Sequence, residues 1–250
     1  MDKWREEKGD VILDQLRQMG ASLDWSRTQF TMSREFRNSV DTAFIKLMDA
    51  GLLYRAEKLV NWSPHLRSAI SDMEVTHLEV SGGQVFDIPG SERPVQFGLM
   101  SDIAYKLVDS DKEIVVSTTR PETLLGDSGI AVHPEDERYK ELHGCKVWHP
   151  FREVAIPIVT DTAVDPTMGT GAVKITPGHD YNDWEMGERH GLEVISVMDE
   201  AGCMVKCDEE FRGLGRLEAR EKMIDALEEM GLLRGQREHE MTIPVCHRTG

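Results

Sequence analysis

The chain has 250 residues, of which 40% are hydrophobic and 30% are charged, a composition typical of globular proteins with a substantial core. No apolar run approaches the roughly 18 residues that span a bilayer, and the first ten residues are rich in charge, so we expect neither a membrane segment nor a secretory signal. The formal net charge is −16, and all of it lies in residues 61–250. Such an acidic chain does not attract nucleic acid through its bulk field, so any RNA contact requires a local basic patch.

The cysteines point to no metal site. Cys145, Cys203, Cys207 and Cys246 include no C-x-x-C pair, and the spacing of the middle two alone is a weak metal signal. We therefore expect free thiols in a reducing compartment, and no bound metal.

Residues 1–72 are expected to be mostly helical. Apolar side chains recur at spacings of three and four from Trp4 to Met19, which predicts an amphipathic helix. Ser33 is placed to cap a second helix that stops at Gly51. The run over 52–62 is typical of a strand, and it leads into a Ser-Pro turn.

From residue 73 onward the pattern changes to short β-like runs separated by turn residues. The expected strands are 75–80, 95–99, 103–108, 114–118, 129–132, 146–149, 154–160 and 172–176. The expected helices are 121–125, 134–142, 181–190 and 217–230. The sequence thus predicts an α+β fold with a barrel-like domain and inserted helices over 73–240, and a return strand in 241–250. Neither end has an obvious partner element, so we expect the chain to be part of a larger protein.

The densest set of reactive side chains lies where an expected strand turns into an expected helix. Lys174, Thr176, His179, Asp180 and Asp183 fall within ten positions of one another. A structural interpretation is also open: the two aspartates could occupy the N-cap and N3 positions of the helix, and the lysine could be a solvated charge on an edge strand.

A second polar motif has the same form, a strand end followed by a helix start. Thr118, Thr119 and Arg120 precede Pro121, which suits the first position of a helix, and Thr123 follows. Because the residue before a proline is extended, the arginine would project from the strand end. The structural alternative is a capped helix start with a solvated arginine and threonine hydroxyls that serve as cap groups.

Together, the stretches TTRPETLLGD and GTGAVKITPGHDYNDWEMGERHGL resemble the editing domain inserted in class I aminoacyl-tRNA synthetases for valine, isoleucine and leucine. The flanks LDWSRTQFTM, LLYRAEKLVNWSP and AISDMEV are similar to the segment that joins this domain to the nucleotide-binding fold, so the resemblance covers essentially the whole chain. Asp183 matches a position that the three enzymes share. Lys174 and Asp180 match the valine-specific members.

The resemblance implies a function. It implies hydrolysis of threonine mischarged onto tRNA(Val), with the tRNA 3′ end, threonine or valine acyl groups and the rest of the synthetase as partners. Residues 1–72 would belong to the flanking nucleotide-binding domain. The parent would use ATP, whereas editing would need no cofactor or metal. The HIGH and KMSKS motifs are absent, so this chain is not expected to charge tRNA. We expect a monomer in the cytoplasm, or in mitochondria.

It also implies roles for individual residues. Asp183 would pair with the α-ammonium of the substrate, and Asp180 would accept a hydrogen bond from the threonine hydroxyl. Lys174 and Thr176 would assist the latter. A second group would hold the terminal adenosine or the ester carbonyl, and it consists of Arg120, Thr119 and Thr123. No general base is evident, so water positioned by these groups and by the ribose hydroxyl is expected to attack.

His179 has two interpretations, an assisting group at the site or a buried structural histidine.

Three other functions are weighed against the hydrolysis of mischarged threonine. Editing for the isoleucine enzyme is disfavoured by Lys174 and Asp180. A metal-dependent hydrolase built on His179, Asp180 and Asp183 lacks a further cluster of His or Cys. A non-catalytic RNA-binding connector is disfavoured by the acidic charge.

Overall fold

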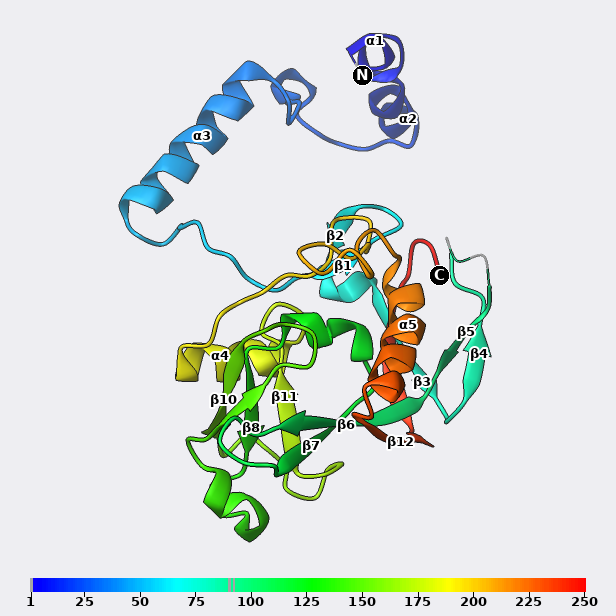
Figure 1. Cartoon of the computed structure of the whole chain (residues 1–250). Helices are drawn as coiled ribbons and strands as arrows, with labels where there is room; N and C mark the ends of the chain where they lie inside the picture. The colour runs from blue at the N-terminus through cyan, green and yellow to red at the C-terminus, as the bar shows by residue number, and fades with distance from the viewer. Residues whose placement is uncertain (1, 90, 92) are drawn as a thin grey trace. The chain divides into compact units, whose positions relative to one another are not determined.

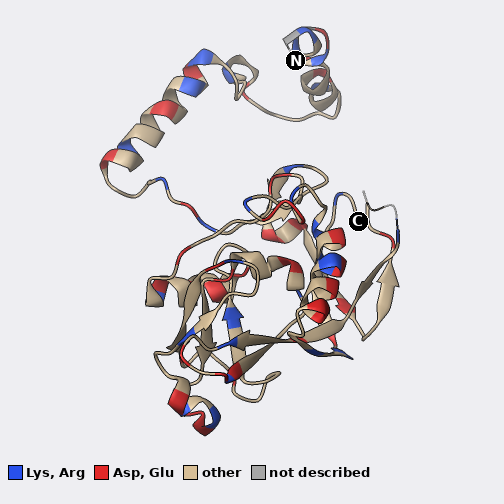
Figure 2. Ribbon diagram, viewed as in Figure 1, with Lys and Arg blue, Asp and Glu red and all other residues tan. Residues whose placement is uncertain are grey.

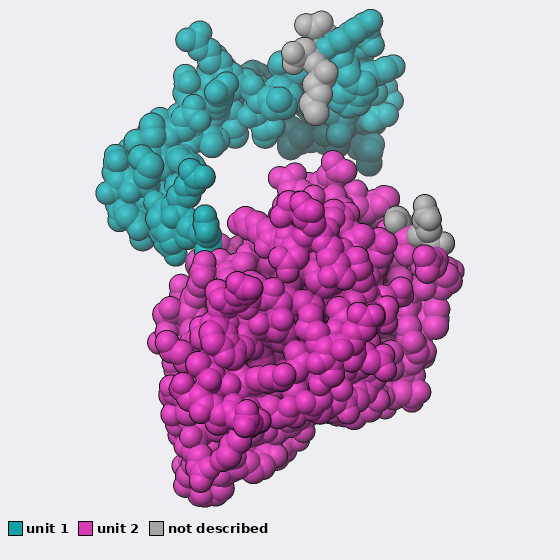
Figure 3. Space-filling view, viewed as in Figure 1, with its two compact units in different colours: residues 1–57 teal, residues 58–250 magenta. Residues whose placement is uncertain are grey.

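The computed structural model describes residues 2–89, 91 and 93–250 and divides the chain into two units, 1–57 and 58–250 (Figure 3). The second unit includes residues 58–72, and the domain boundary expected after residue 72 stays a prediction. Within the described residues, no helix is long and apolar enough to cross a membrane.

The first unit is helical. It contains α1 (Asp2–Lys8), α2 (Val11–Gln18), the 3-10 helix η1 (Trp25–Arg27) and α3 (Arg34–Asp49). Ser33 caps α3 as predicted, with its Oγ accepting from the N–H of Phe36 at 3.3 Å. The single helix predicted over 4–19 is wrong: the chain breaks at Gly9 and Asp10, where the N–H of Gly9 closes the last turn of α1. No residue of α2 or α3 is buried.

Several small sheets build the second unit (Figure 1). Three are two-stranded and antiparallel. They pair β1 (Asn61–Ser63) with β2 (Ser68–Ile70), β3 (Val75–Val80) with β13 (Met241–Cys246), and β4 (Gln84–Phe86) with β5 (Val95–Phe97). The 3-10 helix η2 (Asp72–Glu74) leads into β3. The strand predicted over 52–62 is wrong, because this stretch stays irregular until β1 finds its hairpin partner at residue 61.

Two larger sheets hold the main core. One has the order β12–β6–β7, with β6 (Leu99–Lys106), β7 (Glu113–Thr118) and β12 (Leu233–Glu238). The other has the order β11–β8–β10–β9, with β8 (Gly129–Val132), β9 (Lys146–Trp148), β10 (Ala155–Thr160) and β11 (Ala172–Ile175), and its β8–β10 pair is parallel. Ile103, Ile130, Ile158 and Phe211 are among the buried residues that fill the space between them.

The helices of this unit are η3 (Pro121–Gly126), η4 (Glu137–Leu142), α4 (Tyr181–His190) and α5 (Arg216–Glu229). Of these, η3 and η4 are 3-10 helices, and α5 packs against η3 and β12 (Figure 1). The bounds of α4 are those predicted. An aspartate caps its start, and Gly191, at φ +64°, ends it in the left-handed conformation that favours glycine.

The α+β class is confirmed, but the described strands do not close into a barrel. The two larger sheets approach each other at two places. A single bridge links Leu107, after β6, to Val147 in β9, and the hydroxyl of Thr170 donates to the carbonyl of Val115 in β7 at 2.6 Å. Thr170 lies between two glycines with positive φ, so the chain turns here and β11 forms no ladder with β7.

Candidate functional site

The two polar motifs identified in the sequence meet in the structure. Arg120, at the start of η3, donates from Nη1 to the carbonyl of His179 at 2.7 Å. Thr123, one turn further along η3, accepts a hydrogen bond from Lys174 of β11 at 2.9 Å. Groups that lie more than fifty positions apart in the sequence are therefore in direct contact.

Lys174 is not the solvated charge of the structural interpretation. Its residue is only 6% exposed, and its side chain is enclosed by Thr123 of η3, Asp127 and Thr176. Its ammonium donates to Thr123, to Asp127 Oδ1 at 3.1 Å and to the hydroxyl of Thr176. A lysine has three N–H donors, so all of them are used within the protein.

Asp127 is a central residue of the cluster that the sequence reasoning missed. It is fully buried, and besides Lys174 it accepts hydrogen bonds from the hydroxyls of Thr176 and Tyr105, each at 2.5 Å. Burial, reinforced by the Asp127 charge, raises the pKa of Tyr105 well above its ordinary value of 10.0. The only available signal was position: Asp127 is the last residue of the TTRPETLLGD stretch.

Asp180 is the N-cap of α4, as the structural interpretation proposed. Its Oδ1 accepts from the N–H groups of Asn182, at 2.9 Å, and Asp183, at 3.2 Å. The residue is exposed, and Oδ2 takes no part in these bonds. One oxygen thus stabilises the helix start, while the other is free to bind a ligand.

Asp183 is mostly buried at the N3 position of the same helix. Its Oδ2 accepts from the N–H of Thr176 at 2.9 Å, which ties α4 to the end of β11. Burial raises the pKa of Asp183 from 3.8 to about 6, although Lys174 and the Thr176 N–H lower it. The other oxygen, Oδ1, makes no hydrogen bond. Among the described residues, the side-chain oxygens and nitrogens that are both buried and unpaired do not include it, so Asp183 Oδ1 is accessible to solvent.

His179 is held as a structural residue. Its Nε2 accepts from the N–H of Val197 at 3.0 Å. Burial, together with the positive charges of Arg120 and Lys174, lowers the pKa of His179 from 6.5 to about 4. The ring is therefore neutral near pH 7, and its accepting nitrogen is occupied.

Thr119 lies apart from this network. It lines a small cavity of about 40 Å³ together with Pro121 and Arg220 of α5. Across the described residues, no group of three or more His, Cys, Asp or Glu side chains could hold a metal ion, and the four cysteines are free thiols.

The family model described as tRNA synthetases class I (I, L, M and V) matches residues 1–234. Valine–tRNA ligase of Homo sapiens is 50% identical over 249 residues, which are 99% of this chain and 20% of that protein. The mitochondrial valine–tRNA ligases of Saccharomyces cerevisiae and Sus scrofa are 47% and 51% identical over 250 residues, and the chain covers 23% and 24% of them. The chain thus spans about a fifth to a quarter of these relatives.

Among solved structures, the chain is similar to a leucine enzyme in the ternary complex of Agrobacterium radiobacter K84 agnB2 LeuRS-tRNA-LeuAMS. The TM-score is 0.44 at 20% identity, over 97% of this chain and 36% of that one. The structure titled GlLeuRS-CP1 also has a TM-score of 0.44, at 12% identity, over 56% of this chain and 99% of that one.

Proposed function

The chain belongs to the family of class I tRNA synthetases (I, L, M and V), and we propose that it is the segment of a valine enzyme that hydrolyses threonine mischarged onto tRNA(Val). Two features support this proposal. The curated relatives that are about half identical over nearly the whole chain are valine–tRNA ligases. The two motifs that resemble the editing domain also form one connected polar network.

A valine enzyme needs such a site because valine and threonine are nearly the same shape. A hydrophobic pocket cannot strongly reject an isostere that merely adds a hydroxyl. Valine enzymes are the known example of this limit, and they select valine over threonine by only about 100-fold. A second site has to prefer the hydroxyl. Polar groups that a methyl group would leave unpaired supply a preference of about 1–3 kcal/mol for each buried group.

The observation that carries the proposal is the pair of free carboxylate oxygens beside the rigid Lys174 cluster. Asp183 Oδ1 is open to solvent, the charge of Lys174 acts on this carboxylate, and at pH 7 the carboxylate is mostly ionised because its pKa is about 6. It would pair with the α-ammonium of the threonyl group. Asp180 Oδ2, three residues earlier, would accept the hydrogen bond of the threonine hydroxyl.

In the proposed reaction, water adds to the carbonyl carbon of the threonyl ester. The bond from that carbon to the ribose oxygen then breaks, and the proton lost by the water goes to that oxygen, giving threonine and intact tRNA. Arg120, part of whose side chain is exposed, would stabilise the charge that develops on the carbonyl oxygen, beside Thr123. Lys174 and Thr176 would act by holding the wall of the site in place, and Thr119 would contact the adenosine.

The rest of the proposal concerns the longer protein. Residues 73–240 would form the editing domain, and 1–72 and 241–250 would connect it to the nucleotide-binding domain, where ATP is used. The valine–tRNA ligases that resemble the chain include proteins named as mitochondrial and others that are not, so either compartment fits the proposal.

A deacylation assay tests the proposal, with Thr-tRNA(Val) and Val-tRNA(Val) offered separately. Asp183→Ala should abolish hydrolysis of both, whereas Asp180→Ala should reduce the preference for the threonyl ester. Because Asp180→Ala also removes a helix cap worth about 1 kcal/mol, Ser33→Ala, which removes the cap of α3, is the matched control. The assignment is refuted if Asp183→Ala hydrolyses Thr-tRNA(Val) at a rate within a few-fold of that of the unsubstituted chain. Equal hydrolysis of both esters by the unsubstituted chain would also refute it.

A further inference from the structure

Three arginines surround a single buried carboxylate next to the proposed site. Glu122 of η3 is completely buried and receives two hydrogen bonds from Arg220 of α5, each at 2.8 Å. Arg120 Nε lies 3.6 Å from the same carboxylate. Arg216 lies one turn before Arg220 on α5, so both are on the same face of the helix. One negative charge therefore faces three positive ones.

Arg216 is the member of this group whose hydrogen-bonding capacity is unused. Its guanidinium makes no hydrogen bond or ion pair within the part of the chain that the structure describes, although the residue is only partly exposed. Its aliphatic stem packs beside Gly202, whose carbonyl accepts from the Arg216 N–H at 3.0 Å. Burial lowers the pKa of Arg216, Glu122 raises it, and repulsion from Arg120 and Arg220 lowers it further. An anion at this point would relieve that repulsion.

The start of α5 favours the same kind of ligand. Arg216 is the first residue of this 14-residue helix, and its N-cap, Gly215, has no side chain to cap the first turn. The positive end of the helix therefore adds to the charge of the arginines. Glu218 in that turn is exposed and lies two positions from Arg216, so the two side chains do not share a face. The basic residues of α5 all lie in its first half, and the charged residues of its second half are all acidic (Figure 2).

We infer that Arg216 binds a backbone phosphate of the RNA whose 3′ ester reaches the Asp183 site. This inference rests on the proposed function. The guanidinium fork matches the geometry of phosphate oxygens, and the RNA is the anion that accompanies the proposed substrate. The cluster also supplies the local basic patch that RNA binding by an acidic chain requires.

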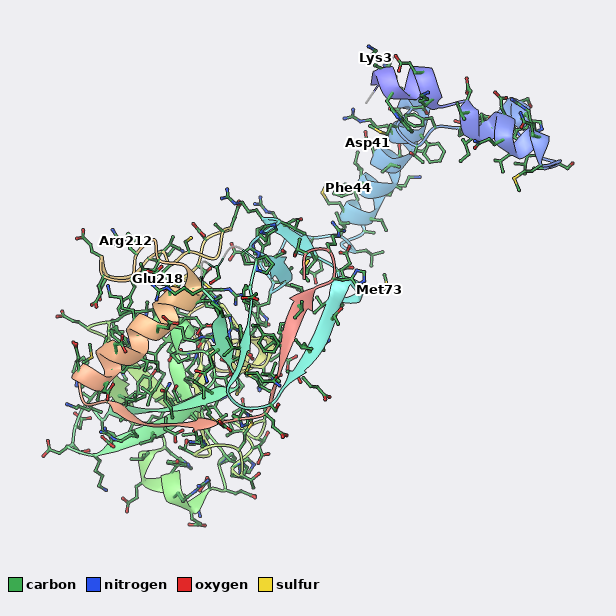
Figure 4. The ribbon with its side chains drawn as sticks, turned by 90° about the vertical axis from the view of Figure 1, so that its right-hand side faces the viewer. Lys3, Asp41, Phe44, Met73, Arg212 and Glu218 are labelled. Carbon is green, nitrogen blue, oxygen red and sulfur yellow. The ribbon has the colours of Figure 1, made fainter. Side chains whose placement is uncertain are left out.

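Binding of an acceptor-stem hairpin RNA ending in CCA, measured over a range of salt concentrations, tests the inference. Each phosphate neutralised on a single strand contributes about 0.7 to the slope of log affinity against log salt. Arg216→Gln should flatten the slope by about that amount, and Arg216→Lys should largely keep it. The control is Arg212→Gln, at a nearby exposed arginine (Figure 4) whose side chain donates to the carbonyl of Cys207; it should leave the slope unchanged.

Hydrolysis separates this inference from the proposed function. Arg216→Gln should raise KM for Thr-tRNA(Val) several-fold but leave hydrolysis of threonyl-adenosine, which has no phosphate, unchanged. Asp183→Ala should abolish both reactions. An unchanged salt slope in Arg216→Gln would overturn the inference and leave the proposed function standing. The RNA assignment would also be overturned if inorganic phosphate inhibited threonyl-adenosine hydrolysis through Arg216, because the site would then take a free anion.

Discussion

The buried pair of Lys174 and Asp127 allows a quantitative prediction of stability. The two side chains are 8% and 0% exposed, and their charged atoms lie 3.1 Å apart. Asp127→Asn keeps the shape of the side chain but leaves the ammonium buried without a counter-charge. Breaking a buried pair in this way costs about 3–5 kcal/mol. The amide N–H group replaces one of the two oxygens, so it would face either the hydroxyl donor of Tyr105 at Oδ2 or that of Thr176 at Oδ1, and we expect the upper half of this range.

Urea unfolding of the chain, followed by tryptophan fluorescence, measures this loss. The ion pair between Lys112 and Glu141 is a matched control: its charged atoms are 3.2 Å apart, but its side chains are 68% and 85% exposed. Glu141→Gln should cost less than about 1 kcal/mol. Combining Asp127→Asn with Lys174→Met should recover part of the loss, because both charges are then removed. If Asp127→Asn costs no more than Glu141→Gln, the pair does not stabilise the site as we argue.

Other predictions concern the neighbouring groups. Asp183 has a pKa of about 6 in the folded chain and an ordinary value of 3.8, which we take for the unfolded chain. The unfolded chain therefore loses this proton first, and the stability of the fold decreases as the pH rises from about 4 to 6. Asp183→Asn should therefore raise stability at pH 7 by up to about 3 kcal/mol, and a gain independent of pH would contradict this. His179, with its pKa lowered from 6.5 to about 4, should cause stability to fall as the pH drops through that interval. His179→Gln, which keeps an acceptor for the Val197 N–H, should weaken this acid sensitivity in denaturation curves and leave the pH–rate profile unchanged above pH 6.5. A Cβ at Gly126 would lie 2.9 Å from a backbone oxygen, so Gly126→Ala should cost about 1–3 kcal/mol, whereas Gly215→Ala, with nothing within 4 Å, should cost little in the same assay.

Local signals predicted local structure well. The start and end of α4 follow from a capping aspartate and from Gly191, each of which acts within one turn of the helix. The strand over 75–80 was also predicted, and β13 pairs with it along its length. The prediction failed over 52–62, because a β-like run forms a strand only where a partner is available.

Non-local interactions were not predictable in the same way. Nothing around Asp127 marks it as buried, since its partner Lys174 lies 47 positions away and Tyr105 lies 22 positions away. The sequence indicated that Lys174 could be either a solvated charge or a substrate ligand. Only its burial and its contacts in the fold reveal a third role, as an internal cation that links η3 to β11. Barrel closure failed for a similar reason, because it depends on pairing between strand edges rather than on strand content.

The saturated ammonium of Lys174 changes how the proposed site would distinguish threonine from valine. A donor that is already bound to three acceptors gains nothing from a substrate hydroxyl unless one of those bonds is broken. Discrimination then depends on an acceptor with free capacity that meets the threonine hydroxyl, which is Asp180 Oδ2, whereas Asp183 Oδ1 binds the α-ammonium that both esters share. Both oxygens lie on the first turn of α4, and the Lys174 cluster fixes that turn through the bond from the Thr176 N–H to Asp183. Lys174→Met should therefore lower kcat for both esters through loss of this positioning, and it should change the preference for the threonyl ester much less than Asp180→Ala does.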